Sequence, residues 1–230
     1  MLAVAHRGFS AKYPENSSAS YIGAIKANAD LIETDVRLSV EGVPLAVHDA
    51  SLRRLTGQNI VISQARSDDI KNTNRFDGES FLTTEQVLKI ARNHIDVLLD
   101  IKSNDTLTIQ RAFDVVAKLD MRDHVVFGLR DLAQIDFLHS LDSQIKTLGM
   151  PNNISEIDVF SEKNVDAIRI WEDWFDNIDI SQPLSQIWMT AGKPIDREAG
   201  EITKKRLGHF SGKNIAAVLL NDPTLIVGAR

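Results

Sequence analysis

The sequence predicts a single α/β domain in which parallel strands close into an eight-stranded (β/α)8 TIM barrel. Short β-rich apolar runs alternate with longer amphipathic stretches from one end of the chain to the other, which is typical of repeated βα units. A length of 230 residues suits one barrel and is short for two full domains. No Gly-x-Gly-x-x-Gly or Walker lysine motif occurs, which disfavours an open nucleotide-binding sheet. We therefore expect one domain over residues 1–230.

Nine apolar runs qualify as strands, one more than a barrel needs. They are Leu2–Ala5, Leu31–Val36, Pro44–His48, Ile95–Ile101, His124–Leu129, Ile145–Met150, Val165–Trp171, Gln186–Thr190 and Ile215–Leu220. The sequence does not decide which run is wrongly assigned or lies outside the barrel.

Amphipathic spacing between these runs predicts the helices. They are Ser17–Asn28, Thr84–Asn93, Thr106–Leu119, Leu132–Leu141 and Thr203–Phe210. Asn16 or Ser17 can cap the first helix, and Thr83 or Thr84 the second. Residues 56–80 are rich in Ser, Asp, Asn and Gln with weak periodicity. They predict a long loop, which in a compact domain is usually functional or mobile.

Composition excludes several classes of protein. Lys and Arg number 26 against 32 Asp and Glu, and the net charge of −6 repels nucleic acid and anionic lipid. An anionic substrate therefore needs a local cationic site. The absence of cysteine excludes disulfides, thiolate metal sites and a cysteine nucleophile. The N-terminus does not resemble a signal peptide, and no apolar run reaches the ~18 residues of a membrane span. We expect a cytoplasmic protein without stable membrane insertion. Its oligomeric state, a homo-oligomer included, stays open.

Carboxylates lie at two of the predicted strand ends, where the chemistry of an α/β barrel collects. Glu33 and Asp35 are two residues apart and so share one face of a strand. If Asp100 converges on them, each like-charged pair costs about 4 kcal/mol at ~4 Å, or roughly 12 for three pairs. A hard divalent cation, Mg²⁺ or Ca²⁺, suits such oxygen ligands. In the alternative, Glu33 and Asp35 face solvent or pair with Arg37 and Lys102.

Two histidines follow predicted strands directly and stand beside charged residues, His6 next to Arg7 and His48 next to Asp49. Two imidazoles can divide proton transfer near neutral pH. The other four are expected to be surface or satisfied core residues: His94, His124, His139 and His209. Arg7 and Lys102 can bind phosphate oxygens. This set indicates phosphodiester cleavage, whereas acyl transfer lacks its Gly-x-Ser-x-Gly motif.

Several short motifs follow one another in a fixed order, densely in the first part of the chain and sparsely to its end. They are His6-Arg7-Gly8, Pro14-Glu15-Asn16-Ser17, Glu33-Thr34-Asp35, the run from Glu41 to Leu52, Arg54-Leu55-Thr56-Gly57 and Leu98-Leu99-Asp100-Ile101-Lys102, with weaker echoes at Trp188 and at Leu220-Asn221-Asp222-Pro223. In order and spacing this set resembles the glycerophosphodiester phosphodiesterase family.

The resemblance implies a TIM barrel that hydrolyses glycerophosphodiesters to sn-glycerol 3-phosphate and an alcohol with a bound Mg²⁺ or Ca²⁺. It assigns the roles as follows: His6 and His48 as acid and base, Glu33, Asp35 and Asp100 as metal ligands, and Arg7 and Lys102 as phosphate contacts. Asn16 would contact the substrate or the water of the metal. Trp188 would form a wall of the pocket.

Three positions depart from the family pattern. Asp100 stands where the family usually has Glu, Ala191 where it often has Asn, and Asn221 where it often has Asp. The acid/base pair is unchanged, but the leaving-group pocket and the identity of the alcohol are left open.

Two rival functions also remain open. One is a phospholipase D-like barrel that acts on lysophospholipids or sphingolipids. Asp100 would suit such an enzyme, but the sequence shows neither the apolar nor the basic rim that a membrane-bound lipid substrate calls for. The other is a barrel that binds a phosphodiester without turnover, which the complete set of candidate residues disfavours. Attack by water and attack by a substrate hydroxyl through a cyclic phosphate are both compatible with the sequence.

Overall fold

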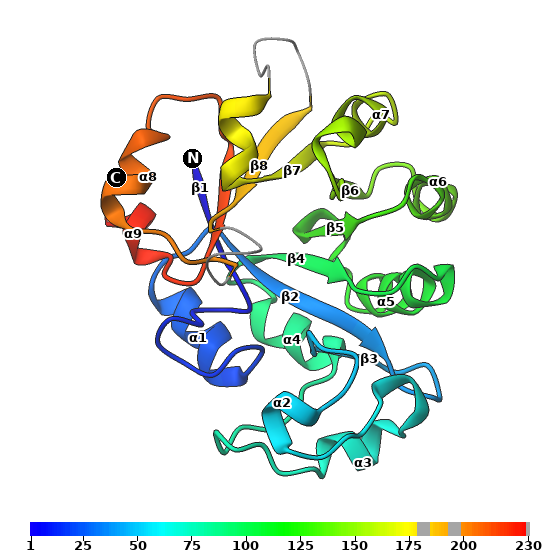
Figure 1. Cartoon of the computed structure of the whole chain (residues 1–230). Coiled ribbons are helices and arrows are strands. Elements are labelled where there is room, and N and C mark those ends of the chain that lie inside the picture. The colour runs from blue at the N-terminus through cyan, green and yellow to red at the C-terminus, as the bar shows by residue number, and fades with distance from the viewer. Residues whose placement is uncertain (179–184, 193–198, 229–230) are drawn as a thin grey trace.

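The computed structural model describes residues 1–178, 185–192 and 199–228. Its centre is a closed barrel of eight parallel strands, with helices on the outside (Figure 1). The strands are β1 (Leu2–Ala5), β2 (Leu31–Leu38), β4 (Asp96–Ile101), β5 (Val125–Leu129), β6 (Lys146–Gly149), β7 (Ala167–Trp171), β8 (Gln186–Thr190) and β9 (Ala217–Leu220). Pairing of β1 with both β9 and β2 closes the barrel. The predicted TIM barrel is confirmed.

The extra strand of the sequence prediction is β3. It covers only Pro44–Leu45 and pairs antiparallel with the end of β2, outside the barrel. The prediction of a strand over Pro44–His48 was therefore too long, because the chain turns away from β2 after Leu45. His48 belongs to the irregular segment that follows and not to the tip of a barrel strand.

Five of the helices that follow the strands begin and end close to the predicted ranges, whereas those over Ile157–Ser161 and Thr224–Val227 were not predicted. These helices are α1 (Ser18–Lys26), α4 (Thr84–Ala91), α5 (Thr106–Lys118), α6 (Leu132–Leu141), α7 (Ile157–Ser161), α8 (Lys204–His209) and α9 (Thr224–Val227). The hydroxyl of Ser17 accepts from the backbone N–H of Ser20, and that of Thr83 from Gln86. These side-chain caps satisfy amides that have no partner within the helix, and so fix where α1 and α4 begin.

Residues 44–83, here called the β3–α4 segment, form a compact layer beside the barrel (Figure 1). The predicted long loop of residues 56–80 was wrong in part, since this stretch holds a 3-10 turn (Ile62–Gln64) and α3 (Ser67–Lys71), after the short helix α2 (Arg53–Thr56). The segment has its own hydrophobic cluster: Leu45, Val47, Leu52, Ile62, Ile70 and Phe81. The sequence did not predict these short helices because this stretch is mostly polar and lacks a clear apolar periodicity.

The barrel interior is filled by one apolar layer to which every strand contributes. The layer contains Val4, Leu31, Leu98, Val126, Leu148, Ala167, Trp188 and Ala217. Alternate residues of a strand share a face, so the inward position two residues farther along β1 is His6. The same step leads to Glu33 on β2 and to Asp100 on β4. The apolar layer thus forms a floor, and the polar side chains stand above it at the carboxyl ends of the strands.

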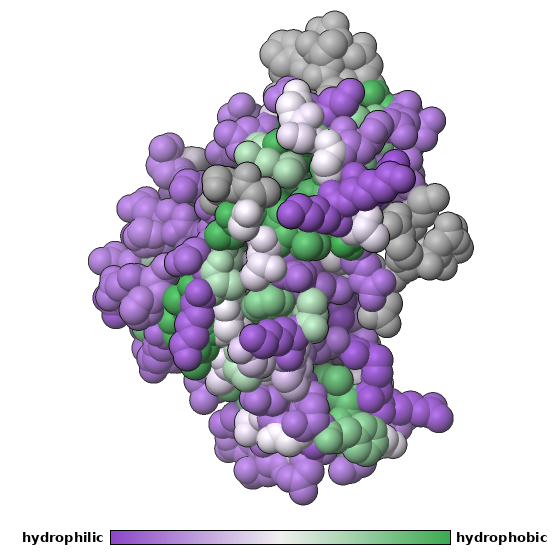
Figure 2. Space-filling model, turned by 90° about the vertical axis from the view of Figure 1, so that its left-hand side faces the viewer, coloured by the Kyte–Doolittle hydropathy of each residue, from purple (hydrophilic) through white to green (hydrophobic). Residues whose placement is uncertain are grey.

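Among the described residues, no helix has the length and apolar character that a membrane crossing requires. Figure 2 shows one face of the molecule, where hydrophobic residues lie in small groups between hydrophilic ones. Scattered apolar residues of this kind are normal on protein surfaces.

Candidate active site

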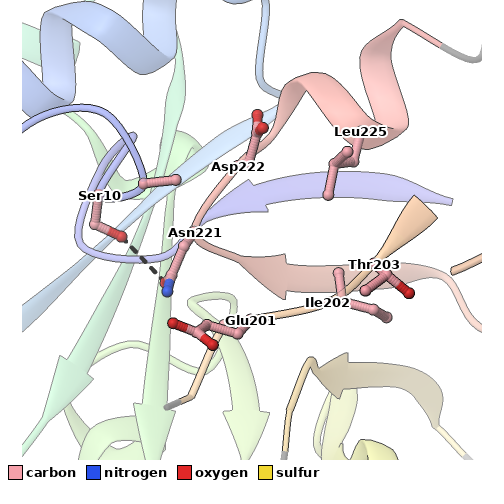
Figure 3. A pocket seen from close by; sticks show the side chains of 9 residues that line it. Ser10, Glu201, Ile202, Thr203, Asn221, Asp222 and Leu225 are labelled. Atoms are coloured by element: carbon pink, nitrogen blue, oxygen red, sulfur yellow. Dashed lines mark hydrogen bonds between the residues drawn. The ribbon is translucent and has the colours of Figure 1, made fainter. Parts of the chain in front are cut away.

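A cavity of about 170 Å³ lies at the carboxyl ends of the barrel strands. Its lining consists of His6, Arg7, His48, Asp100, Lys102, Arg130, Met150, Arg169, Trp171, Thr190, Ala199 and Leu219. Both candidate histidines therefore line one cavity. A larger cavity of about 520 Å³ lies beside Ser10 and Asn221 (Figure 3). No histidine is among its described lining residues, so we place the chemistry in the smaller cavity.

The three predicted carboxylates converge: one oxygen each of Glu33, Asp35 and Asp100 lies within 4.8 Å of the others. Glu33 is 1% exposed, and its Oε2 accepts the backbone N–H of Arg7 at 2.7 Å. Its Oε1 is buried without a hydrogen-bond partner among the described residues. Burial, then Asp35 and Asp100, raise the pKa of Glu33 well above its usual value. The alternative that Glu33 and Asp35 face solvent is wrong.

Lys102 and Arg7 bind these carboxylates. Lys102 Nζ lies 2.9 Å from Asp35 Oδ1 and 2.5 Å from Asp100 Oδ2, and Arg7 Nε lies 3.4 Å from Asp35 Oδ2. Burial alone would raise the pKa of Asp35, but the charges of Lys102 and Arg7 hold it well below its ordinary range. Asp35 is thus ionised at neutral pH, and both cations stand where they also line the cavity.

Asn16 lies behind Asp35 and not in the cavity lining, in contrast to the predicted substrate contact. Its Nδ2 donates to Asp35 Oδ2 at 2.7 Å, and its Oδ1 accepts from Tyr21 Oη at 2.8 Å. Asn16 is 1% exposed and has a φ of 49°, a left-handed conformation that Asn tolerates better than most residues. It therefore positions a carboxylate.

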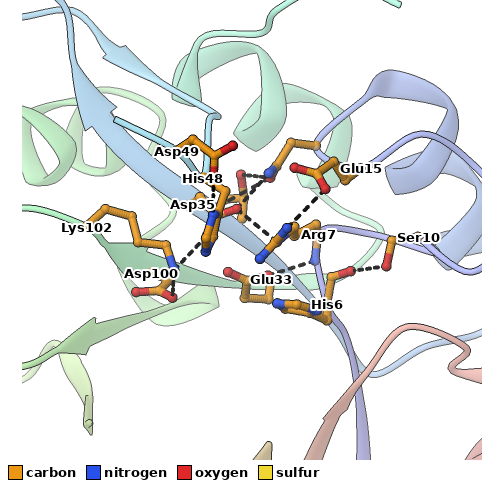
Figure 4. Close-up of polar contacts among 12 residues, drawn as sticks. His6, Arg7, Ser10, Glu15, Glu33, Asp35, His48, Asp49, Asp100 and Lys102 are labelled. Atoms are coloured by element: carbon orange, nitrogen blue, oxygen red, sulfur yellow. Dashed lines mark hydrogen bonds and ion pairs between the residues drawn. The ribbon is translucent and has the colours of Figure 1, made fainter. Parts of the chain in front are cut away.

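His48 is oriented by a chain of ion pairs that returns to the other side of the site. Figure 4 labels His48 and Asp49 at one end of this chain and Glu15 and Arg7 at the other. His48 Nδ1 lies 2.7 Å from Asp49 Oδ1, and Asp49 Oδ2 accepts from Arg54 Nε at 2.6 Å. Arg54 Nη2 donates to Glu15 Oε1 at 2.6 Å, and Arg7 Nη1 donates to Glu15 Oε2 at 3.0 Å. An ionised carboxylate only accepts hydrogen bonds. Neutral His48 therefore carries its proton on Nδ1 and has an unprotonated Nε2.

His6 is held from the opposite side by Asn221, which follows β9. His6 Nδ1 lies 2.8 Å from Asn221 Oδ1, which also accepts from Ser10 Oγ at 3.1 Å (Figure 3). An acceptor at this position places the His6 proton on Nδ1 as well. His6 is 8% exposed, and burial followed by the charge of Arg7 lowers its pKa to about 4. Burial likewise lowers the pKa of His48. Both rings are neutral near pH 7.

Trp188 lies in the apolar floor of the barrel and is absent from the described lining of the cavity. Trp188 is in the middle of β8, and its role as a wall of the pocket stays a prediction. Thr190, two residues farther along the same face, reaches the cavity. Trp171, at the end of β7, is the tryptophan that lines it.

Two arginines of the cavity, Arg130 after β5 and Arg169 on β7, were not predicted. Arg130 binds both carboxylate oxygens of Asp100, Nη1 pairing with Oδ1 and Nη2 with Oδ2, the latter at 2.9 Å. The sequence held a signal for both. Arg130 comes four residues after the floor residue Val126, and Arg169 comes two residues after Ala167, so alternation places each on the inward face of its strand, above the floor.

Comparison with known proteins agrees with this geometry. The model of the glycerophosphoryl diester phosphodiesterase family matches residues 6–142. YhdW of Bacillus subtilis is 32% identical over 111 residues, which cover 45% of this chain and 46% of YhdW. The glycerophosphodiester phosphodiesterase of Caldanaerobacter subterraneus is 32% identical over 152 residues, covering 58% of this chain and 62% of that enzyme. The matched segments thus span less than two thirds of these relatives.

Solved structures share the fold along the whole chain. A phosphodiesterase from Oleispira antarctica, solved with the product sn-glycerol 3-phosphate, has a TM-score of 0.83 and 18% identity, covering 100% of this chain and 96% of that one. The glycerophosphodiester phosphodiesterase of Thermotoga maritima has a TM-score of 0.81 and 20% identity, with 100% and 98% coverage. The family model covers more than half of the sequence, including every carboxylate of the converging group. The chain therefore belongs to the glycerophosphoryl diester phosphodiesterase family.

Proposed function

We propose that this protein hydrolyses glycerophosphodiesters to sn-glycerol 3-phosphate and an alcohol. The observation that carries the proposal is the single cavity that His6 and His48 share with Arg7 and Lys102. Family membership and the product bound to the Oleispira antarctica relative support the same substrate class. The cavity has both elements that such a reaction requires: cations for the phosphoryl oxygens and two groups able to transfer protons.

We further propose that a divalent cation, Mg²⁺ or Ca²⁺, binds to Glu33, Asp35 and Asp100. The unpartnered Glu33 Oε1 supports this, because a buried carboxylate oxygen needs a hydrogen bond or a cation. Three oxygen donors within 4.8 Å and no sulfur suit a hard ion. Such an ion supplies positive charge against the nonbridging oxygens of the phosphodiester. It would also offset the charges of Asp35 and Asp100, which together with the larger effect of burial raise the pKa of Glu33.

For the proton transfers we propose His6 as base and His48 as acid. Each ring has its Nδ1 engaged, by Asn221 and Asp49 respectively, which leaves Nε2 for the substrate. The pKa of about 4 keeps His6 neutral and ready to accept a proton. Burial lowers the pKa of His48 as well, so in this proposal His48 gains a proton on Nε2 before it donates one to the leaving alkoxide. Arg7 and Lys102 orient the phosphoryl oxygens between the rings.

The test is release of sn-glycerol 3-phosphate from a panel of glycerophosphodiesters, with and without EDTA. Wild type should release product, EDTA should abolish release, and Mg²⁺ or Ca²⁺ should restore it. His6→Asn and His48→Asn should each lose about 100-fold or more in kcat, as for removal of a general acid or base. His94→Asn, at an exposed histidine outside the cavity lining, is the matched control. Activity that survives both EDTA and the two site variants would refute the scheme.

The two rival functions have distinct outcomes in the same assay. A phospholipase D-like enzyme would act on lysophosphatidylcholine in preference to glycerophosphocholine. A binding barrel without turnover would hold glycerophosphocholine intact through hours of incubation with Mg²⁺ or Ca²⁺. We favour the glycerophosphodiesterase because the family model matches residues 6–142 and the Oleispira antarctica relative was solved with sn-glycerol 3-phosphate.

A further inference from the structure

Arg169 is a buried guanidinium of the cavity that has no anionic partner among the described residues. It lies on β7, is 6% exposed and lines the cavity. Its Nη2 donates to the carbonyl of Pro151 at 3.4 Å, and its Nη1 has no hydrogen-bond partner in the described part of the chain. A buried charged donor without an acceptor is costly, so its retention calls for an explanation.

Aromatic packing compensates this charge only in part. The guanidinium carbon of Arg169 lies 4.6 Å from the ring centroid of Trp171 and 5.9 Å from that of Trp174. Ring faces attract a cation but accept no strong hydrogen bond. Burial, and then the charge of Arg130, lower the pKa of Arg169 to about 10, so it remains protonated near neutral pH. The residue is held in place as a cation, with at least one N–H group left to donate.

The other three cations of the cavity already have carboxylate partners. Lys102 and Arg130 share Asp100, and Arg7 pairs with Asp35 and with Glu15. Among the cationic side chains that the structure describes in the cavity lining, Arg169 therefore differs in having none. The positive charge at β7 is surplus to what the carboxylates of β2 and β4 balance.

The position of Arg169 in the barrel separates it from the proposed site of reaction. The sheet order runs β2, β4, β5, β6, β7, so β7 stands four strands around the eight-stranded barrel from β2, on its opposite side. His6, Glu33 and Asp100 belong to β1, β2 and β4 or directly follow them. A diester whose phosphorus sits among these residues can extend one arm across the cavity toward β7.

We propose that Arg169, with Trp171 beside it, binds a second anionic group carried by one arm of the phosphodiester. A guanidinium matches the paired oxygens of a phosphate monoester or a carboxylate. The inference rests on the proposed phosphodiesterase function and narrows its substrates to diesters with an additional negative charge. It also gives the surplus cation the acceptor that the described residues do not provide.

Three substrates of similar length test this: glycerophosphoglycerol, the same diester with a terminal phosphate monoester, and the diester of glycerol and glycerate, which has a carboxylate. We expect wild-type kcat/KM to be at least about tenfold higher for one of the anionic substrates than for glycerophosphoglycerol, as for a charge-assisted hydrogen bond. The preferred member of the anionic pair identifies the group.

Arg169→Met should reduce that preference at least about tenfold, mainly through KM. Arg169→Lys, which keeps the charge and loses the planar fork, should give an intermediate preference. Arg92→Met, at an exposed arginine outside the cavity lining, should keep the wild-type preference. Circular dichroism verifies that each variant is folded. The comparison of the three substrates uses the wild-type protein alone and so does not depend on the folding of a variant. Equal kcat/KM for all three substrates, or an unchanged preference in folded Arg169→Met, overturns the inference alone. No hydrolysis of any substrate overturns the proposed function as well.

Discussion

Replacing Gly200 with alanine should disable His6 by displacing the groups behind it. Gly200 has a φ of +89°, and an added Cβ would come within 2.1 Å of Asn221 Oδ1 and 2.8 Å of His6 Nδ1. The left-handed conformation costs an L-residue about 1–2 kcal/mol, and overpacking adds about 1–3 kcal/mol. A ring displaced by ~1 Å loses about 100-fold in rate. We therefore expect unfolding free energy to fall by about 2–5 kcal/mol and kcat to fall about 100-fold.

Gly212→Ala is the matched control, because Gly212 has a φ of +74° and nothing lies within 4 Å of an added Cβ. It should show the conformational cost alone, about 1–2 kcal/mol, with unchanged kcat. Urea unfolding gives the stabilities, and release of glycerol 3-phosphate gives the rates. If the two variants match in both stability and kcat, the close packing of Gly200 against His6 has no functional effect and the reasoning fails.

Three further outcomes follow from the support of the carboxylates and of His6. Asn16→Ala removes a hydrogen bond to Asp35 and should weaken the binding of Mg²⁺ or Ca²⁺, measured by calorimetry, about 10- to 100-fold. The control is Asn28→Ala, at an exposed residue that also has a positive φ, and it should leave this binding unchanged. Tyr21→Phe removes a buried hydroxyl that bonds Asn16 and should lower the unfolding free energy by about 1–3 kcal/mol in urea, while an unchanged midpoint would contradict that bond. Because folding lowers the pKa of His6 from 6.5 to about 4, the unfolded chain binds the proton more readily between these values. The unfolding free energy of the metal-free protein should therefore not change through His6 above pH 6.5, and it should fall by about 3 kcal/mol as the pH is lowered toward 4. His6→Asn should lack this dependence on pH.

The barrel could be predicted because its signals are local. Each strand is a short apolar run, and Ser17 and Thr83 mark helix starts by capping, which depends only on residues three positions apart. The error at Pro44–His48 has a different origin. An apolar run has the same pattern whether it joins a parallel barrel or pairs antiparallel at its edge, so the sequence does not place β3.

The site could be predicted only in part for a similar reason. Alternation along β2 and β4 placed Glu33, Asp35 and Asp100 together without knowledge of contacts. How deep a residue lies along its strand depends on the stagger of the barrel, and sequence alone does not give it. Trp188 was therefore assigned to the pocket although it lies in the floor. The hydrogen bonds of Asn16 to Asp35 and Tyr21 are set by tertiary packing, and the sequence did not predict them.

The separate hydrophobic cluster of the β3–α4 segment has a consequence for heat resistance. His48 follows Leu45 and Val47 of that cluster directly, so its place over the barrel depends on a small packing unit outside the closed sheet. Small units of this kind can open independently of the rest of a protein. Turnover would then stop at a temperature below the melting point of the barrel, and it would recover on cooling because the eight-stranded scaffold had never come apart.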